Sequence, residues 1–177
     1  MAAVRNGTAA ERYEQAIAVH GAALERLARA YEADQDRRLD LLQEIHIALW
    51  RSLAGFDERC SLRTWVYRVA HNTATSLVLR RRAGTPTFVS LDELASRPAG
   101  GSAEEEVDQQ RLLDRVLALI HALAPLDRQV ILLYLEGMDA SAIGDITGLS
   151  SSNVATKVHR IKKILSQRFH QGGHHVE

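Results

Sequence analysis

Polar and basic side chains near the C-terminus share one face of a helix predicted over residues 151–169. Apolar residues at Val154, Val158, Ile161 and Leu165 form the stripe expected to be buried. The opposite face carries Ser152, Asn153, Thr156, Lys157, Arg160 and Lys163, with no acidic residue from Asn153 to His170. Short hydrogen-bonding groups near a helix N-terminus suit base edges, and flanking cations suit phosphates. The segment predicts a helix that reads the major groove of DNA; a solvated amphipathic helix is the alternative.

Two glycines precede this helix at a spacing that favours a tight helix pair. Gly144 lies inside a helix predicted over residues 139–147, and Gly148 follows directly after it. The missing side chain at Gly144 lets the second helix approach, and Gly148 can adopt the backbone conformation of a turn. Together with apolar Leu149, this spacing predicts a helix-turn-helix unit.

Basic, aromatic and amide side chains are interleaved in a further helix, predicted over residues 61–82. The stripe expected to be buried consists of Leu62, Trp65, Val66, Val69, Thr73 and Leu77. The face expected to be exposed consists of Arg63, Tyr67, Arg68, His71, Asn72 and Thr75, and it is followed by Arg80, Arg81 and Arg82. Aromatic and cationic groups on one helix suit nucleic acid with unstacked bases.

An acidic and polar face is predicted in the helix over residues 38–53. Its core stripe is Leu41, Leu42, Ile45, Leu49 and Leu53. A second face carries Asp40, Gln43, Glu44, Ile47 and Trp50. A polar face edged by an aliphatic side chain and an indole is typical of a surface that contacts another protein. A solvated face with a half-buried Trp50 is the alternative.

The elements that position these residues are all helical, so the predicted fold class is all-α. Further helices are expected over residues 11–32, over residues 102–123 and from Pro125 to Gly137. Proline, glycine and acidic residues gather in residues 83–103, which predicts a flexible acidic linker between two small bundles. Ser90 and Ser102 are expected to cap a short turn and the next helix. The predicted domains are residues 1–82 and 104–170, with a tail at 171–177.

Composition and charge exclude several classes of protein. Of 177 residues, 46% are hydrophobic and 25% are charged, which is typical of a globular chain. The net charge is zero, yet residues 51–82 carry seven basic and two acidic side chains, which favours polyanion binding. Cys60 is the single cysteine, so an intramolecular disulfide is excluded. No apolar run approaches the ~20 residues of a membrane span, which predicts a soluble, intracellular chain.

Three runs of residues resemble one known family. Asp-Leu-Leu-Gln-Glu at residues 40–44 and Thr-Trp-Val-Tyr-Arg-Val-Ala-His-Asn at residues 64–72 are similar to region 2 of bacterial sigma factors of the extracytoplasmic-function type. Leu-Ala-Pro-Leu-Asp-Arg-Gln-Val-Ile at residues 123–131, followed by the helix-turn-helix, resembles region 4 of the same family. Residues 11–169 are covered, and both regions occur in the family's order.

The resemblance implies a partner for each predicted surface. The β′ subunit of core RNA polymerase would be bound by Asp40, Gln43, Glu44 and Ile47. The β subunit of the polymerase is a further expected partner. The minus-ten promoter element would be opened and held by Phe56, Arg63, Trp65, Arg68, His71, Asn72, Arg80 and Arg81. The minus-thirty-five element would be read as duplex by Ser152, Asn153, Thr156, Lys157, Arg160 and Lys163. An anti-sigma factor would cover the polymerase-binding faces.

Other functions stay open at this point. A dimeric helix-turn-helix regulator would act without polymerase, but no apolar dimer seam is visible outside the two predicted cores. An enzyme is disfavoured because the histidines have no metal-ligand spacing and no nucleophile–base motif is present. We therefore expect no catalytic residue, metal or cofactor. A sigma-like adaptor without DNA binding conflicts with the basic face at residues 152–163. Cys60 is expected to be an inert thiol, with a redox switch as the alternative.

Overall fold

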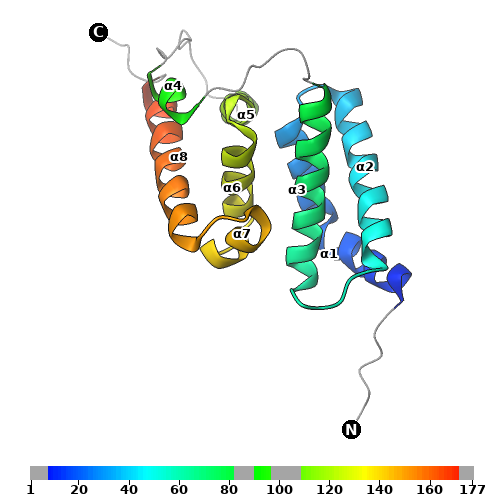
Figure 1. Cartoon of the computed structure of the whole chain (residues 1–177). Coiled ribbons are helices and arrows are strands. Elements are labelled where there is room, and N and C mark those ends of the chain that lie inside the picture. The colour runs from blue at the N-terminus through cyan, green and yellow to red at the C-terminus, as the bar shows by residue number, and fades with distance from the viewer. Residues whose placement is uncertain (1–7, 82–89, 97–108, 172–177) are drawn as a thin grey trace. The chain divides into compact units, whose positions relative to one another are not determined.

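Most of the residues that the structure describes lie in helices. The computed structural model describes residues 8–81, 90–96 and 109–171, and of residues 109–112 and 169–171 the backbone alone. Within these ranges there are eight helices and no strand (Figure 1). The prediction of an all-α fold is confirmed. The chain divides into two compact units, unit 1 (Met1–Ala83) and unit 2 (Gly84–Glu177), and each is described by itself.

Unit 1 contains three helices that pack pairwise against one another. They are α1 (Ala9–Tyr31), α2 (Gln35–Leu53) and α3 (Leu62–Arg81). Each begins after a side chain that accepts a hydrogen bond from a free N–H group of the first turn: Thr8, Asp34 and Ser61. The cap fixes where the helix starts, and therefore which of its faces meets the neighbouring helices.

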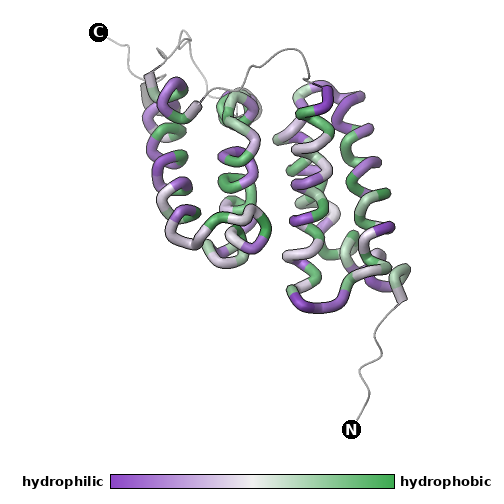
Figure 2. Tube along the Cα trace, in the orientation of Figure 1, coloured by the Kyte–Doolittle hydropathy of each residue, from purple (hydrophilic) through white to green (hydrophobic). Residues whose placement is uncertain are grey.

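The core of unit 1 combines large aliphatic side chains of α2 with small and aromatic ones of α1. Leu41, Ile45, Leu49 and Leu53 are fully buried, as predicted for α2. From α1 come Leu24, Leu27 and Tyr31 together with four alanines, Ala16, Ala23, Ala28 and Ala30. Alanines allow α1 to approach its neighbours closely. Figure 2 shows how hydrophobic and hydrophilic residues are interleaved along these helices.

The predicted orientation of α3 is wrong. Its buried residues are Thr64, Val66, Tyr67, Ala70, His71, Ala74 and Val78. Trp65, Val69 and Leu77 of the predicted stripe are only half-buried. The physical reason is that α3 packs against both α1 and α2, so that it has two buried sides instead of one. Tyr67 and His71, which were expected to be exposed, lie in this interior.

Unit 2 contains the remaining helices. They are α4 (Leu91–Ser96), α5 (Gln109–Ala122), α6 (Pro125–Leu135), α7 (Ala140–Thr147) and α8 (Ser151–Gln171). Pro125 is the first residue of α6, as predicted, and Ser90 accepts a hydrogen bond from the N–H of Glu93 at the start of α4. The predicted cap at Ser102 lies outside the described residues.

A buried arginine ties α6 to the end of α5. The side chain of Arg128 is 1% exposed and donates from Nε to the carbonyl of Ile120 (3.1 Å) and from Nη2 to that of Leu123 (3.2 Å). It also donates to the carbonyl of His121. These carbonyls lie at the C-terminal end of α5, where a helix has no partners of its own and where a cation is favoured. The guanidinium therefore closes a helix end that would otherwise be buried without hydrogen bonds.

The helix-turn-helix of α7 and α8 turns at two glycines, as predicted. Gly148 has φ +78° and donates its N–H to the carbonyl of Gly144 at 2.8 Å. A Cβ atom on Gly144 would lie 2.6 Å from the carbonyl oxygen of Leu149, too close for any real contact. Glycine at position 144 is thus required by the close passage of the turn backbone over α7.

Replacement of Gly144 by alanine should lower the free energy of unfolding by about 1–3 kcal/mol, because the Leu149 carbonyl would have to shift. Gly21→Ala is the matched control. A Cβ atom there would lie 3.7 Å from Cγ2 of Ile17, an ordinary contact in the middle of α1. Alanine should stabilise that helix by about 0.5–1 kcal/mol. Urea unfolding followed by circular dichroism measures both changes; equal effects of the two variants would refute the close approach.

Candidate nucleic-acid and protein interfaces

The polar face of α8 is formed as predicted at its N-terminal half. Ser152, Asn153, Thr156, Arg160 and Lys163 are exposed, and Lys157 is half-buried. Ser150 accepts a hydrogen bond from the N–H of Asn153 at 3.2 Å, which fixes the start of the helix. Short polar side chains thus stand ahead of the cations along one face. Base edges and phosphates of a duplex require groups in this order.

Two of these cations are already paired within unit 2. Nζ of Lys157 lies 2.6 Å from Oδ1 of Asp127, whose side chain is only 10% exposed. Arg160 forms an ion pair with Asp92 of α4. Lys157 therefore contributes to holding α8 against α6, while Arg160 is bound by a carboxylate from the acidic segment that was expected to be a linker. Neither pairing can be read from helical periodicity, because the partners lie 30 and 68 residues away.

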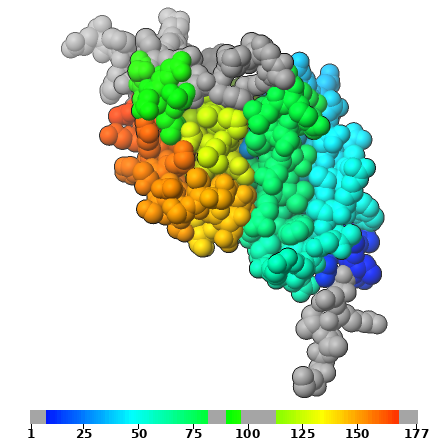
Figure 3. Space-filling view, viewed as in Figure 1, coloured from blue at the N-terminus to red at the C-terminus, as the bar shows by residue number. Residues whose placement is uncertain are grey.

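The short helix α4 packs along α8 (Figure 3). Leu91 and Leu94 are buried, and the carbonyl of Leu94 accepts a hydrogen bond from Arg168. Ile164 lies between Arg160 and Arg168 at four-residue spacing, and it is buried. Leu165, which was predicted to be buried, is half-buried. Contact with α4 adds a second covered side to α8, which explains the wrong assignment of Leu165.

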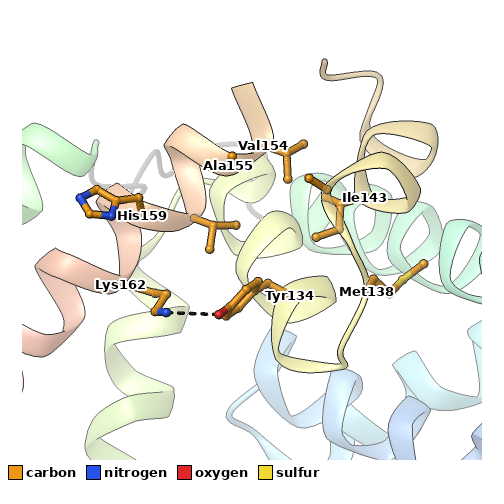
Figure 4. A pocket seen from close by; sticks show the side chains of 9 residues that line it. Tyr134, Met138, Ile143, Val154, Ala155, His159 and Lys162 are labelled. Atoms are coloured by element: carbon orange, nitrogen blue, oxygen red, sulfur yellow. Dashed lines mark hydrogen bonds between the residues drawn. The ribbon is translucent and has the colours of Figure 1, made fainter. Parts of the chain in front are cut away.

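An apolar groove of about 300 Å³ lies on another side of α8 (Figure 4). Its lining residues come from the segment 134–143 and from α8: Tyr134, Met138, Ala140, Ile143, Val154, Ala155, Val158, His159 and Lys162. Nζ of Lys162 lies 3.2 Å from the hydroxyl of Tyr134 at its rim. At 100° per residue, Ala155, Val158 and Lys162 point away from Asn153, Thr156 and Arg160. His159 of the groove lies within about 20° of Ser152 around the helix, so one edge of the groove adjoins the polar face.

The predicted minus-ten residues separate into exposed, paired and buried groups. Arg63, Asn72 and Arg80 are exposed, and Arg68 is half-buried. Arg81 pairs at 3.3 Å with both Glu32 and Asp40, so it links α3 to α1 and α2. Phe56 and His71 are buried, and Trp65 is half-buried.

His71 does not lie on the surface of unit 1. It is 1% exposed, and its Nδ1 shares a hydrogen bond of 3.0 Å with the hydroxyl of Tyr31. Burial lowers the pKa of His71 to about 3, so the ring is neutral at physiological pH. The prediction that His71 is exposed is wrong, because α3 packs on both sides.

Phe56 and Trp65 form the floor of the loop between α2 and α3. Phe56 is 9% exposed, and its ring centroid lies 5.3 Å from that of the half-buried Trp65. Nε1 of Trp65 donates to Oγ of Ser52 at 3.1 Å. Phe56, which was expected to contact the minus-ten element, has a buried ring that helps to close the bundle. Cys60, in the same loop, is half-buried.

The acidic face of α2 is formed as predicted. Asp40, Gln43 and Glu44 are exposed and Ile47 is half-buried. Trp50 is 51% exposed, and its ring lies edge-on to that of Tyr13 with 5.2 Å between the ring centroids. The hydroxyl of Tyr13 in turn lies 2.8 Å from Nδ1 of His46. An exposed indole held by a neighbouring ring beside carboxylates suits contact with another protein.

The described residues offer neither a metal site nor a membrane span. No cluster of three or more histidine, cysteine, aspartate or glutamate side chains placed to hold a metal ion occurs among them. None of the helices in the described ranges is both long enough and apolar enough to cross a lipid bilayer.

Two family models match the chain, one in each unit. Sigma-70 region 2 matches residues 16–84 and sigma-70 region 4 matches residues 113–165. RNA polymerase sigma factor CnrH of Cupriavidus metallidurans is 29% identical over 161 residues, which cover 87% of this chain and 84% of CnrH. ECF RNA polymerase sigma factor SigW of Bacillus subtilis is 24% identical over 139 residues, with 73% of each chain covered.

A solved structure shares the fold. The sigma factor RpoE from Bartonella quintana, in complex with the anti-sigma factor NepR, matches with a TM-score of 0.68 and 18% sequence identity, covering 89% of this chain and 96% of that one. The matches to sigma-70 region 2 and region 4, in this order, define a factor for transcription initiation. The chain belongs to the sigma-70 family, as an RNA polymerase sigma factor of the extracytoplasmic-function type.

The buried His71 should make unfolding pH-dependent. Because its pKa in the folded chain is about 3 and that of an unfolded histidine is 6.5, the unfolded state binds one more proton between these values. His71 should therefore lower the free energy of unfolding by about 1.4 kcal/mol for each pH unit below 6.5. Comparing urea unfolding from pH 7 to pH 5 for the wild type and His71→Gln isolates the effect. An identical pH dependence of both would contradict burial of a neutral ring.

The ion pair between Asp92 and Arg160 should compete with DNA. Asp92→Asn in the full chain should raise the affinity for a short duplex about two- to fivefold at low salt, since an exposed pair is worth up to ~1 kcal/mol. Fluorescence anisotropy measures this change. Glu93→Gln removes the same charge from the same helix and is the matched control. In an Arg160→Ala background the gain from Asp92→Asn should vanish; an equal gain there would show a general charge effect instead.

Proposed function

We propose that this sigma factor binds core RNA polymerase and directs it to promoters with a minus-ten and a minus-thirty-five element. The observation that carries the proposal is the match of region 2 and region 4, in order, to two separate helical units. Unit 1 exposes an acidic face on α2, and unit 2 exposes a polar and basic face on α8. One unit would hold the polymerase and open DNA, and the other would read duplex DNA upstream.

Polymerase contacts are assigned to both units. The face of Asp40, Gln43, Glu44 and Ile47 would bind the β′ subunit, with Trp50 at its edge. The β subunit is assigned to the groove between Tyr134 and α8, because this groove is apolar and its residues Val158 and Lys162 lie opposite Asn153 and Arg160 on the helix. A protein can therefore occupy it while α8 lies in a major groove.

The DNA contacts follow the exposed residues. Arg63, Arg68, Asn72 and Arg80 are retained for the minus-ten element, and Phe56, Trp65 and His71 become supports of the surface. Ser152, Asn153, Thr156 and Lys163 are retained for the minus-thirty-five element. Lys157 and Arg160 would join them when phosphate replaces their carboxylate partners. Such contacts make affinity fall steeply with salt.

No catalysis is proposed for this chain. Its binding energy alone would open the start region, since base capture and aromatic stacking at ~1–3 kcal/mol per base offset the cost of unstacking. The site of action would be the cytoplasm, where the polymerase is. RpoE forms a complex with an anti-sigma factor, and we extend that mode of regulation to this chain: a partner protein would cover the polymerase-binding faces.

Charge reversal at Glu44 tests the polymerase face. Glu44→Arg should weaken binding to core polymerase at least about tenfold. In the complex, a carboxylate contact buried in the interface would be replaced by a repulsive contact of the arginine. Glu25→Arg is the matched control, since Glu25 is an exposed carboxylate of α1 in the same unit. Affinity is measured by titrating labelled full chain with core polymerase, and circular dichroism checks helical content. Unchanged affinity of Glu44→Arg would rule out this face.

A further inference from the structure

The loop between α2 and α3, residues 55–61, has an unusual backbone at Glu58. Its φ is +63°, and it is the one non-glycine residue with positive φ in the described part of the chain. A side chain in this region costs free energy, so such a residue persists only where its surroundings hold it in place. A contact that fixes Glu58 therefore decides the shape of the whole loop.

Arg12 of α1 supplies that contact. Its Nη1 donates to the carbonyl of Phe56 at 3.0 Å, and its Nη2 lies 2.8 Å from Oε1 of Glu58. The guanidinium carbon also lies 5.4 Å from the centroid of the Phe56 ring. The Arg12 side chain is 15% exposed and that of Glu58 is 51% exposed, so the guanidinium is sheltered while the carboxylate is open to solvent. One planar group thus contacts a backbone carbonyl, a carboxylate and a ring of the loop.

The loop has a buried floor and a charged rim. The rings of Phe56 and Trp65 contact each other below it at a tilt of 53°, and Ser61 caps α3 at its end. At the rim, Oδ2 of Asp57 accepts a hydrogen bond from Nε of Arg59 at 2.5 Å, and this bond lowers the pKa of Asp57. The Arg59 side chain is 88% exposed. The rim is therefore presented to solvent in one defined conformation, although none of its own side chains is buried.

We propose that Arg12 is a positioning residue for promoter opening, which holds the α2–α3 loop in the shape that receives an unstacked base at the rim formed by Asp57 and Arg59. This inference rests on the proposed function, in which this end of unit 1 opens DNA. Arg12 does not touch the base. It acts through Phe56 and Glu58, which carry the loop.

The physical advantage is preorganisation. A loop that is ordered only when DNA arrives loses conformational entropy at that moment, and this loss subtracts from the binding free energy. The guanidinium fork holds the carbonyl and the carboxylate before DNA is bound. Lysine at position 12 would keep the charge but has no planar fork, so it cannot reproduce both contacts with the same geometry.

The test uses the full chain with core polymerase, on a promoter from which the wild type initiates. A fluorescent base analogue in the non-template strand reports strand opening. Arg12→Ala should slow opening about tenfold, and Arg12→Lys and Glu58→Gln should slow it less. Affinity for core polymerase should not change. On the same promoter with a pre-opened minus-ten region, the difference between Arg12→Ala and the wild type should shrink to less than about twofold.

Each outcome has one meaning. Equal opening by the wild type and all three variants would overturn the inference, and so would a defect of Arg12→Ala that persists on pre-opened DNA. If Arg12→Ala unfolds, Glu58→Gln decides alone, because Gln keeps the size of the side chain and removes only the charge. A wild-type chain that opens no promoter would instead refute the proposed function.

Discussion

Packing of α3 against both α1 and α2 is the constraint on which unit 1 depends. It places Tyr67 and His71 in the interior, and it leaves a narrow outer strip with Arg63, Asn72 and Arg80 for a partner. The hydrogen bond of Tyr31 with His71 satisfies a ring that burial keeps neutral. The surface proposed to open DNA would thus be carried by α3, and Tyr67 and His71, which were expected to be exposed, hold this helix in place.

Several of the cations that DNA would contact form ion pairs with carboxylates of the chain itself. Asp127 holds Lys157, Asp92 holds Arg160, and Asp40 holds Arg81. The pair of Lys157 is the most sheltered of the three and contributes to the position of α8. The pair of Arg160 is exposed, and exposed pairs are weak enough for a phosphate to replace them. The free chain would accordingly bind DNA less tightly than its basic face alone suggests, and the acidic segment near Asp92 would act on affinity without touching DNA.

The sequence was sufficient for the fold class, for the buried face of α2 and for the turn at Gly148, because each depends on local periodicity or on a local backbone requirement. It was insufficient for α3, whose apolar, small and polar residues are spread around the helix, so that periodicity favours no single buried face. The roles of Arg12, Arg128 and Asp92 were also missed. Each makes contacts that are distant in sequence or that involve backbone carbonyls, and neither kind of contact leaves a periodic signal. The assignment of surfaces to polymerase, minus-ten and minus-thirty-five DNA stays a prediction.

We conclude that one chain with two helical units directs core RNA polymerase to promoters. Run-off transcription of genomic DNA by purified core polymerase, with and without this chain, tests it most directly. The account predicts new, discrete start sites that require the chain and share two sequence elements at a fixed separation upstream. The absence of new start sites, together with the absence of a complex between the chain and core polymerase, would contradict it.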